Sequence, residues 1–206
     1  MNSGLYLDFH DSFSWNVIDL FSKNHFKLSR HSYKDIQNVV DSKSAPELIV
    51  LGPGPGHPND YFEVIDHLRP LFEQGRTFFV GVCLGHQILG ILSGGKVVSS
   101  KEPMHGCSVE VSKTDFFNFA GSSFPQRKFN NEALLVQRYN SLVLHSDEDP
   151  KKSYLYDKNG EILAIKGQNF LSYQFHPESV GSSFPSAWFL PIENSLYYNT
   201  KDGPRN

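Results

Sequence analysis

The fold of this chain is decided by residues 77–95, TFFVGVCLGHQILGILSGG. Residues 77–82 form a nearly continuous apolar run, which is typical of a strand buried on both faces of a parallel sheet. Residues 84–93 have the pattern of a helix, and Gly94 with Gly95 provides a C-terminal stop. The stretch therefore predicts a strand that passes directly into a helix through Cys83.

The same alternation of strand and helix runs through the preceding residues. Strands are predicted at residues 5–7, 26–30 and 48–51, each followed by apolar residues at helical spacing. These apolar residues are Phe13, Val17, Leu20 and Phe21, expected in the core; Ile36, Val39 and Val40; and Val64, Ile65, Leu68 and Leu71. Strands that alternate with helices favour a parallel sheet covered on both faces.

After Lys96 the candidate strands become short and follow one another. They cover residues 97–98, 109–111, 134–136, 154–156, 162–165 and 171–173. Residues 115–131, rich in Phe, Asn, Ser and Gly, are expected to form an irregular insertion or loop. The sequence thus predicts one α/β domain over residues 1–206, an open, mostly parallel sheet flanked by helices with additional antiparallel strands.

The composition excludes several classes of function. The 206 residues are 39% hydrophobic and carry a net charge of −3, so we expect a globular protein without the basic surface that binds nucleic acid or anionic membranes. The first residues lack the pattern of a signal peptide, and no apolar run approaches the length of a membrane span. We expect a cytoplasmic location, where the two cysteines do not form a disulfide framework.

Cys83 lies in Gly81-Val82-Cys83-Leu84-Gly85, whose G-x-C-x-G spacing is that of a nucleophile elbow. The glycines permit a sharp turn that projects the sulfur from the end of the sheet. The start of the following helix provides free N–H groups and a positive dipole end, which favour a thiolate and can hold an oxyanion. Alternatively, Cys83 is a small buried apolar residue between strand and helix.

A base for a cysteine nucleophile is available in Gln174-Phe175-His176-Pro177-Glu178. In an extended segment, His176 and Glu178 point to the same side and can pair as a base and its orienting carboxylate. A surface histidine or half of a metal site are the alternatives. A zinc deaminase would require a later P-C-x-x-C pair, and no cysteine follows Cys107, which excludes that class of site.

A third candidate element is the loop at residues 52–58, GPGPGHP, which follows the predicted strand at residues 48–51. Its residues are either stiff or lack a Cβ, so the loop can aim N–H groups at an oxyanion. An ordinary tight connection is the alternative role. The loop does not match either phosphate-binding glycine motif.

Together these segments resemble class I glutamine amidotransferases, and within them the glutaminase component of anthranilate synthase and aminodeoxychorismate synthase. The matching segments are residues 11–13 (DSF) with Asn16, 54–56 (GPG), 81–87 (GVCLGHQ), 101–102 (KE), 104–106 (MHG), 138–142 (RYNSL) and 175–179 (FHPES). The match spans nearly the whole chain. It implies the flavodoxin-like fold of that family. Met104-His105-Gly106, together with the start Asp11-Ser12-Phe13, resembles its chorismate-using branch.

The resemblance also implies roles for individual residues. Cys83 would attack the glutamine carboxamide, His176 would shuttle the proton and Glu178 would orient His176. The expected substrate contacts are Gly54, Pro55, Gly56, Leu84, Gln87, Ser141 and Leu142, with the N–H groups of Gly54 and Leu84 holding the oxyanion. No metal or organic cofactor is implied. The expected partners are L-glutamine and a chorismate-binding synthase subunit in a hetero-oligomer serving tryptophan or folate biosynthesis.

The sequence departs from the family pattern at three places. Asn140 replaces the more usual histidine, Cys107 replaces a lysine, and the chain from about residue 181 is atypical, with Pro185 and Pro191 interrupting a final helix. Two other functions stay open: a stand-alone thiol hydrolase of γ-glutamyl substrates, and an inactive scaffold. The remaining histidines singled out are expected to be structural, interfacial or solvent-facing: His10, His57, His86 and His105.

Overall fold

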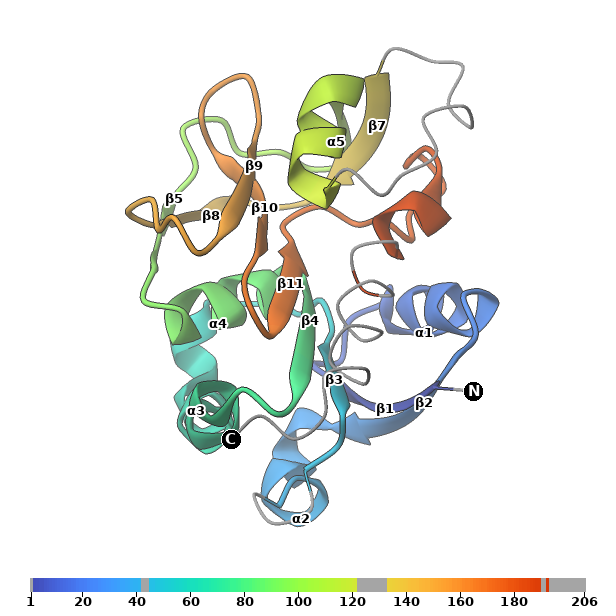
Figure 1. The fold of residues 1–206 in the computed structure, drawn as a ribbon, viewed down its shortest axis with the longest axis vertical. Helices are drawn as coiled ribbons and strands as arrows, with labels where there is room; N and C mark the ends of the chain where they lie inside the picture. Colours follow the sequence, from blue (N-terminus) through green and yellow to red (C-terminus); the bar gives the residue numbers. More distant parts are fainter. Residues whose placement is uncertain (1, 42–44, 122–132, 190–191, 193–206) are drawn as a thin grey trace.

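The computed structural model describes residues 2–41, 45–121, 133–189 and 192. Its centre is a seven-stranded sheet with the order β2-β1-β3-β4-β11-β10-β9 (Figure 1). The strands of this sheet are β1 Asn2–Asp8, β2 Phe26–Ser32, β3 Leu48–Leu51, β4 Phe78–Val82, β9 Ser153–Tyr156, β10 Ile162–Lys166 and β11 Phe170–Tyr173. The first five strands in this order are parallel to one another. β10 is antiparallel to β11, and β9 is antiparallel to β10. The predicted mostly parallel sheet is confirmed.

Helices cover both faces of this sheet. The helices are α1 Ser14–Lys23, α2 Ile36–Val39, α3 Phe62–Gln74, α4 Leu84–Leu92 and α5 Lys113–Ala120, with shorter 3-10 turns η1 Tyr33–Asp35, η2 Pro58–Tyr61 and η4 Pro185–Phe189. Figure 1 shows α3 and α4 on one side of the sheet and α1 on the other. None of the helices in the described ranges is long and apolar enough to cross a membrane.

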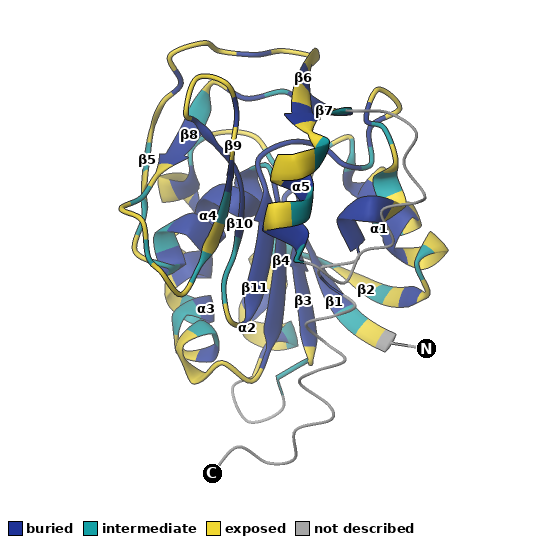
Figure 2. Cartoon of the chain, turned by 45° about the horizontal axis from the view of Figure 1, so that its top comes forward, coloured by how far each residue is buried: buried dark blue, intermediate teal, exposed yellow. Residues whose placement is uncertain are grey.

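Alternation along the strands divides the core between these two faces. In β3, Leu48 and Val50 pack on the face of α1, whereas Ile49 and Leu51 pack on the face of α2, α3 and α4. Because successive side chains of a strand point to opposite faces, a wholly apolar strand is required wherever both faces are covered. The central strands are buried along their length (Figure 2).

The second half of the chain adds two antiparallel ribbons beyond the carboxyl ends of the parallel strands. One pairs β5 Lys96–Ser99 with β8 Leu142–His145 (Figure 1), and the other pairs β6 Cys107–Ser112 with β7 Ala133–Arg138 (Figure 2). The short strands predicted after Lys96 are therefore confirmed. The sequence pattern missed β8, which begins within the RYNSL segment and continues beyond it.

The expectation of a loop at residues 115–131 is wrong for its first part, where α5 extends to Ala120. Ser112 caps this helix, because its Oγ accepts a hydrogen bond from the N–H of Asp115 at 3.0 Å. Phe116 and Phe119 are buried against the core, so packing stabilises a segment whose composition suggested a loop. The remainder of that prediction, residues 122–131, lies outside the described residues.

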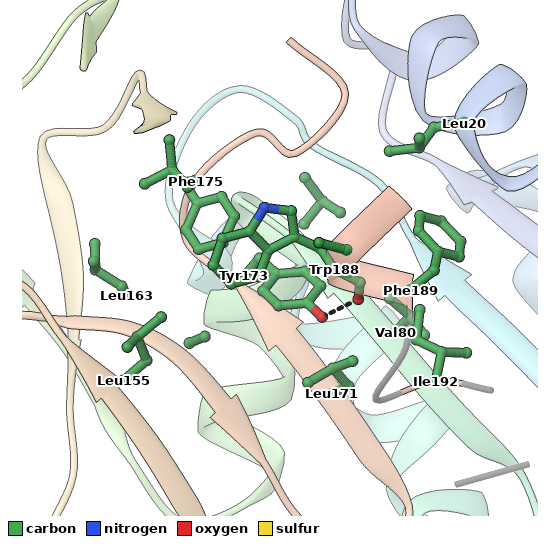
Figure 3. Packing of buried hydrophobic residues seen from close by; sticks show 14 of the residues in the cluster. Leu20, Val80, Leu155, Leu163, Leu171, Tyr173, Phe175, Trp188, Phe189 and Ile192 are labelled. Carbon is green, nitrogen blue, oxygen red and sulfur yellow. Dashed lines mark hydrogen bonds between the residues drawn. The ribbon is translucent and has the colours of Figure 1, made fainter. Parts of the chain in front are cut away.

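A cluster of aromatic side chains closes the face opposite α3 and α4. Trp188 from η4 is fully buried and packs edge-on against Phe175 and Phe116. The hydroxyl of Tyr173 donates a hydrogen bond to the backbone oxygen of Trp188, as Figure 3 shows. The described part of the atypical C-terminal region is thus fixed to the sheet next to β11. Of the expected tail, residues 190–191 and 193–206 lie outside the described residues.

We expect Trp188→Ala to lower the free energy of unfolding by about 3–5 kcal/mol, because it removes a large, fully buried side chain. Trp15→Ala is the matched control, since the Trp15 side chain is 62% exposed and its ring lies under the guanidinium of Arg30. Its cost should stay within about 1 kcal/mol. Urea unfolding followed by circular dichroism measures both, and equal losses would contradict this account of the core.

Candidate active site

Cys83 occupies the turn between β4 and α4 with a backbone φ of 55° and ψ of −103°. A positive φ in a residue with a side chain costs on the order of 1–3 kcal/mol and persists only where the surroundings enforce it. Here the N–H of Cys83 donates to the backbone oxygen of Tyr173 at 2.8 Å, which ties the turn to β11. The predicted strand, elbow and helix are all present.

The two glycines of the elbow are required by close approach. A Cβ on Gly81 would lie 2.5 Å from the backbone oxygen of Gly85, and a Cβ on Gly85 would overlap the backbone oxygen of Leu51. Real Cβ atoms do not make such contacts, so side chains at either position would push α4 away from the sheet. The G-x-C-x-G spacing therefore holds the start of α4 against β3 and β4.

His176 and Glu178 form a buried pair, with 2.6 Å between Nδ1 of the imidazole and Oε1 of the carboxylate. The predicted extended geometry is wrong. β11 ends at Tyr173, and the N–H of Ser179 donates to the backbone oxygen of His176, so the segment turns. The N–H of His176 itself donates to the backbone oxygen of Gln137. A turn, rather than strand alternation, brings the two side chains together.

Two aromatic rings pack against the imidazole of His176. The centroids of Phe13 and Tyr139 lie 5.0 and 5.2 Å from that of His176. Phe13 was expected in the core, but it is only half-buried and contacts the site instead of either core cluster. The N–H of Phe13 donates to Oδ1 of Asp11 at 2.8 Å, which positions it just before α1. Sequence reasoning assigned neither aromatic residue a role in the site.

Burial by itself lowers the pKa of His176, but hydrogen bonds to Cys83 and Glu178, and the charges of both groups, raise it to about 10. The ring is therefore an imidazolium at neutral pH. It lies between the Cys83 sulfur and a carboxylate that is almost fully buried. This is the arrangement of a nucleophile, a proton donor and an orienting anion.

Cys83 opens into a cavity of about 190 Å³. Its walls are formed by Gly54, Pro55, Gly56, Cys83, Leu84, Gln87, Tyr139, Asn140, Ser141 and Leu142. The structure thus brings together all seven predicted substrate contacts and adds Tyr139 and Asn140, which were not predicted to contact substrate. The cavity is smaller than the roughly 300–1,000 Å³ of pockets for drug-sized ligands, so it suits a small metabolite.

One wall of this cavity is fixed by a chain of side-chain amides. Nε2 of Gln87 donates to the backbone oxygen of Leu142 at 3.1 Å and to Oε1 of Gln174 at 3.2 Å. Nε2 of Gln174 in turn lies 3.9 Å from the Cys83 sulfur as a donor. Gln87 therefore links the start of α4 to the first residue of β8.

Two backbone N–H groups remain available at the cavity. Within the described part of the chain, no hydrogen bond uses the N–H of Gly54 or of Leu84. Leu84 is the first residue of α4, where N–H groups have no partner within the helix and form the positive end of its dipole. These donors lie beside Cys83 in the same cavity wall and can hold an oxyanion.

The other histidines lie apart from this arrangement. His86 is fully buried, its Nδ1 lies 2.9 Å from Oγ of Ser172, and burial lowers its pKa to about 3, so its ring is neutral. His57 accepts a hydrogen bond from the N–H of Asn59 at the start of η2. Over the described ranges, no group of three or more His, Cys, Asp or Glu side chains could hold a metal ion.

Comparison with known proteins agrees with this geometry. Residues 5–190 match the family model for "Glutamine amidotransferase class-I". Anthranilate synthase component 2 of Pseudomonas aeruginosa is 33% identical over 190 residues, covering 85% of this chain and 87% of the relative. Aminodeoxychorismate synthase component 2 of Escherichia coli is 31% identical over 182 residues, covering 85% and 91%.

Solved structures show the same fold. A putative GMP synthase component from Thermoplasma acidophilum superposes with a TM-score of 0.76 at 13% identity, covering 98% of this chain and 96% of that one. A glutamine amidotransferase from Thermotoga maritima superposes with a TM-score of 0.63 at 18% identity, covering 98% and 86%.

We expect Glu178→Gln to lower the pKa of His176, because burial then opposes protonation without the carboxylate. The measurement is a titration of the imidazole nitrogens by NMR, with a midpoint near 10 in the unmodified chain. Glu63→Gln, on the exposed side of α3, is the control and should leave that midpoint unchanged. A His176 midpoint that stays the same in Glu178→Gln would show that the pair does not control the ring.

The same pKa predicts how stability depends on pH. The folded value of about 10 lies above the ordinary value of 6.5, so protonation of His176 stabilises the folded state. This contribution is complete below pH 6.5 and is lost as the pH rises through 10. Urea unfolding between these pH values should therefore show a larger loss of stability in the unmodified chain than in Glu178→Gln.

Proposed function

This chain belongs to the class I glutamine amidotransferase family, and we propose that it hydrolyses L-glutamine to glutamate and ammonia through a thioester on Cys83. The observation that carries this proposal is the composition of the cavity. Cys83 shares its walls with every residue expected to contact glutamine, next to the His176 and Glu178 pair.

In the first half of the reaction, the Cys83 thiolate attacks the carboxamide carbon of glutamine. The tetrahedral oxyanion is held by the free N–H groups of Gly54 and Leu84, which are fixed before the charge develops. The protonated His176 then gives its proton to the departing nitrogen, the C–N bond breaks, and ammonia leaves. Its raised pKa supports this role, because the ring carries the proton at neutral pH.

In the second half, water attacks the γ-glutamyl thioester. His176, now neutral, accepts a proton from this water, and glutamate is released as the Cys83 thiolate re-forms. Glu178 stabilises the imidazolium and fixes the ring orientation at both stages. Phe13 and Tyr139 restrict the ring further through contact with its sides. Each step uses groups of this chain, glutamine and water.

The ammonia is delivered to a chorismate-binding synthase subunit, in the formation of anthranilate, 4-amino-4-deoxychorismate or both. The support is the names of the relatives, which are the second components of anthranilate synthase and of aminodeoxychorismate synthase. Relatives of both kinds are 31–35% identical over similar shares of the chain, so identity favours neither product. The product is then determined by the synthase subunit.

We expect the purified chain to release ammonia and glutamate from glutamine, and a chorismate-binding synthase subunit to increase this rate. Cys83→Ala should reduce the rate by at least about a thousandfold, because it removes the nucleophile. Cys107→Ala is the matched control: Cys107 is exposed and lies outside the cavity, so its loss should leave the rate unchanged.

Two results would overturn the proposal. Hydrolysis of γ-glutamyl compounds without any effect of a synthase subunit would identify a stand-alone thiol hydrolase. Absence of hydrolysis of both substrate classes, with the synthase subunit bound, would identify a scaffold.

A further inference from the structure

We propose that Asn140 is a positioning residue, which fixes the backbone of Ser141 and Leu142 at the glutamine cavity by connecting it to a buried cluster of charges. This inference rests on the proposed function and extends it to a residue that differs from the family pattern. Asn140 itself is buried and lines the cavity beside both residues.

The cluster is centred on Arg138, the last residue of β7, whose side chain is fully buried. Its NH1 donates to Oδ2 of Asp157 at 2.7 Å, and its NH2 donates to Oε2 of Glu161 at 2.8 Å. Both carboxylates are themselves buried. A guanidinium held by two carboxylates in a dry environment has one geometry available, so it is a rigid anchor.

The third donor of Arg138 determines the orientation of Asn140. Nε of Arg138 donates to Oδ1 of Asn140 at 3.1 Å, and Nδ2 of Asn140 donates to the backbone oxygen of Leu142 at 2.9 Å. Only the oxygen of the amide can face a guanidinium, which has donors and no acceptor. The amide nitrogen is therefore directed at Leu142 by the charge of Arg138.

The same cluster holds the neighbouring peptide group from a second side. Ser100 donates through its Oγ to Glu161 at 2.8 Å, and its N–H donates to the backbone oxygen of Ser141 at 2.9 Å. The backbone oxygen of Leu142 also accepts the bond from Gln87. Both backbone oxygens are thus fixed by hydrogen bonds from neighbouring elements, which sets how the two peptide groups are presented to a ligand.

The charge of Glu161 is stabilised in this position. Burial alone raises the pKa of Glu161, but hydrogen bonds from Arg138, Ser100 and the N–H of Lys101 outweigh burial and lower the pKa below its ordinary value. The carboxylate is consequently ionised at neutral pH and keeps Arg138 in place. Asn140 is the one side chain among the described residues that bonds both to Arg138 and to the cavity backbone.

Asn140→Asp tests this role with almost no change in side-chain shape. One carboxylate oxygen can still accept from Arg138, but the other replaces the donor and faces the backbone oxygen of Leu142, which repels it. The measurement is alkylation of Cys83 by iodoacetamide, followed by mass spectrometry of the Cys83 peptide at increasing glutamine concentrations. The full chain is used alone and with a chorismate-binding synthase subunit.

We expect the glutamine concentration for half-protection to rise about tenfold in Asn140→Asp, as for one lost buried hydrogen bond, while alkylation without glutamine stays within about twofold. Asn140→Ala, which also removes the donor but adds no charge, should weaken protection in the same direction. Asn159→Asp is the matched control: its side chain bonds Glu102 at the surface, and protection should be unchanged.

The outcomes separate the two proposals. Equal half-protection in the unmodified chain and both Asn140 variants would overturn the positioning role and leave glutamine binding intact. The positioning role would also be overturned if alkylation without glutamine fell in the Asn140 variants by as large a factor as protection by glutamine weakened. Asn140 would then act on Cys83 or on the fold. If glutamine fails to protect the unmodified chain, alone and with the synthase subunit, the proposed function fails and this inference with it.

Discussion

The structure depends on one strained turn, in which Cys83 adopts a positive φ between a buried strand and a helix. Three contacts enforce it: the close packing permitted at Gly81 and Gly85, and the bond from the N–H of Cys83 to Tyr173. The strain is maintained by the rest of the sheet, because Tyr173 belongs to β11 and Gly85 packs against β3. Cys83 is thus positioned by two neighbouring strands as well as by its own.

The sheet order explains why distant segments form one cavity. β3, β4 and β11 are adjacent and parallel, so the segments that leave their carboxyl ends emerge together. These segments carry Gly54, Cys83 and His176, and the segment after β1 adds Phe13. Ligands of open α/β sheets bind at this edge for the same reason. The antiparallel ribbons supply the remaining wall through Ser141 and Leu142, at the start of β8.

The sequence was sufficient to predict what depends on local patterns. The apolar run before Cys83, its glycines and the alternation of strands and helices each have a direct structural cause, and the parallel sheet followed from them. The cavity-lining residues were identified by resemblance, because their spacing alone does not show that they converge. Asp157 and Glu161 could not be recognised as partners of Arg138, since isolated charges usually face solvent. Phe13 was misassigned because an apolar residue at helical spacing is usually buried in a core. The helix α5 was predicted as a loop because the polar and glycine-rich residues around it are typical of loops.

The placement of β11 beside β4 has a consequence for how the protein is made. Phe79 pairs with Phe170, so β4 lacks one neighbour until about 90 further residues have been synthesised. Forming such a long-range pair requires closing a large loop, which makes it a slow step in folding. The same step brings His176 to Cys83 and fixes the turn through Tyr173. In a nascent or truncated chain that lacks β11, Cys83 therefore has no imidazole beside it, and the arrangement on which the proposed chemistry depends forms only as this last parallel strand docks.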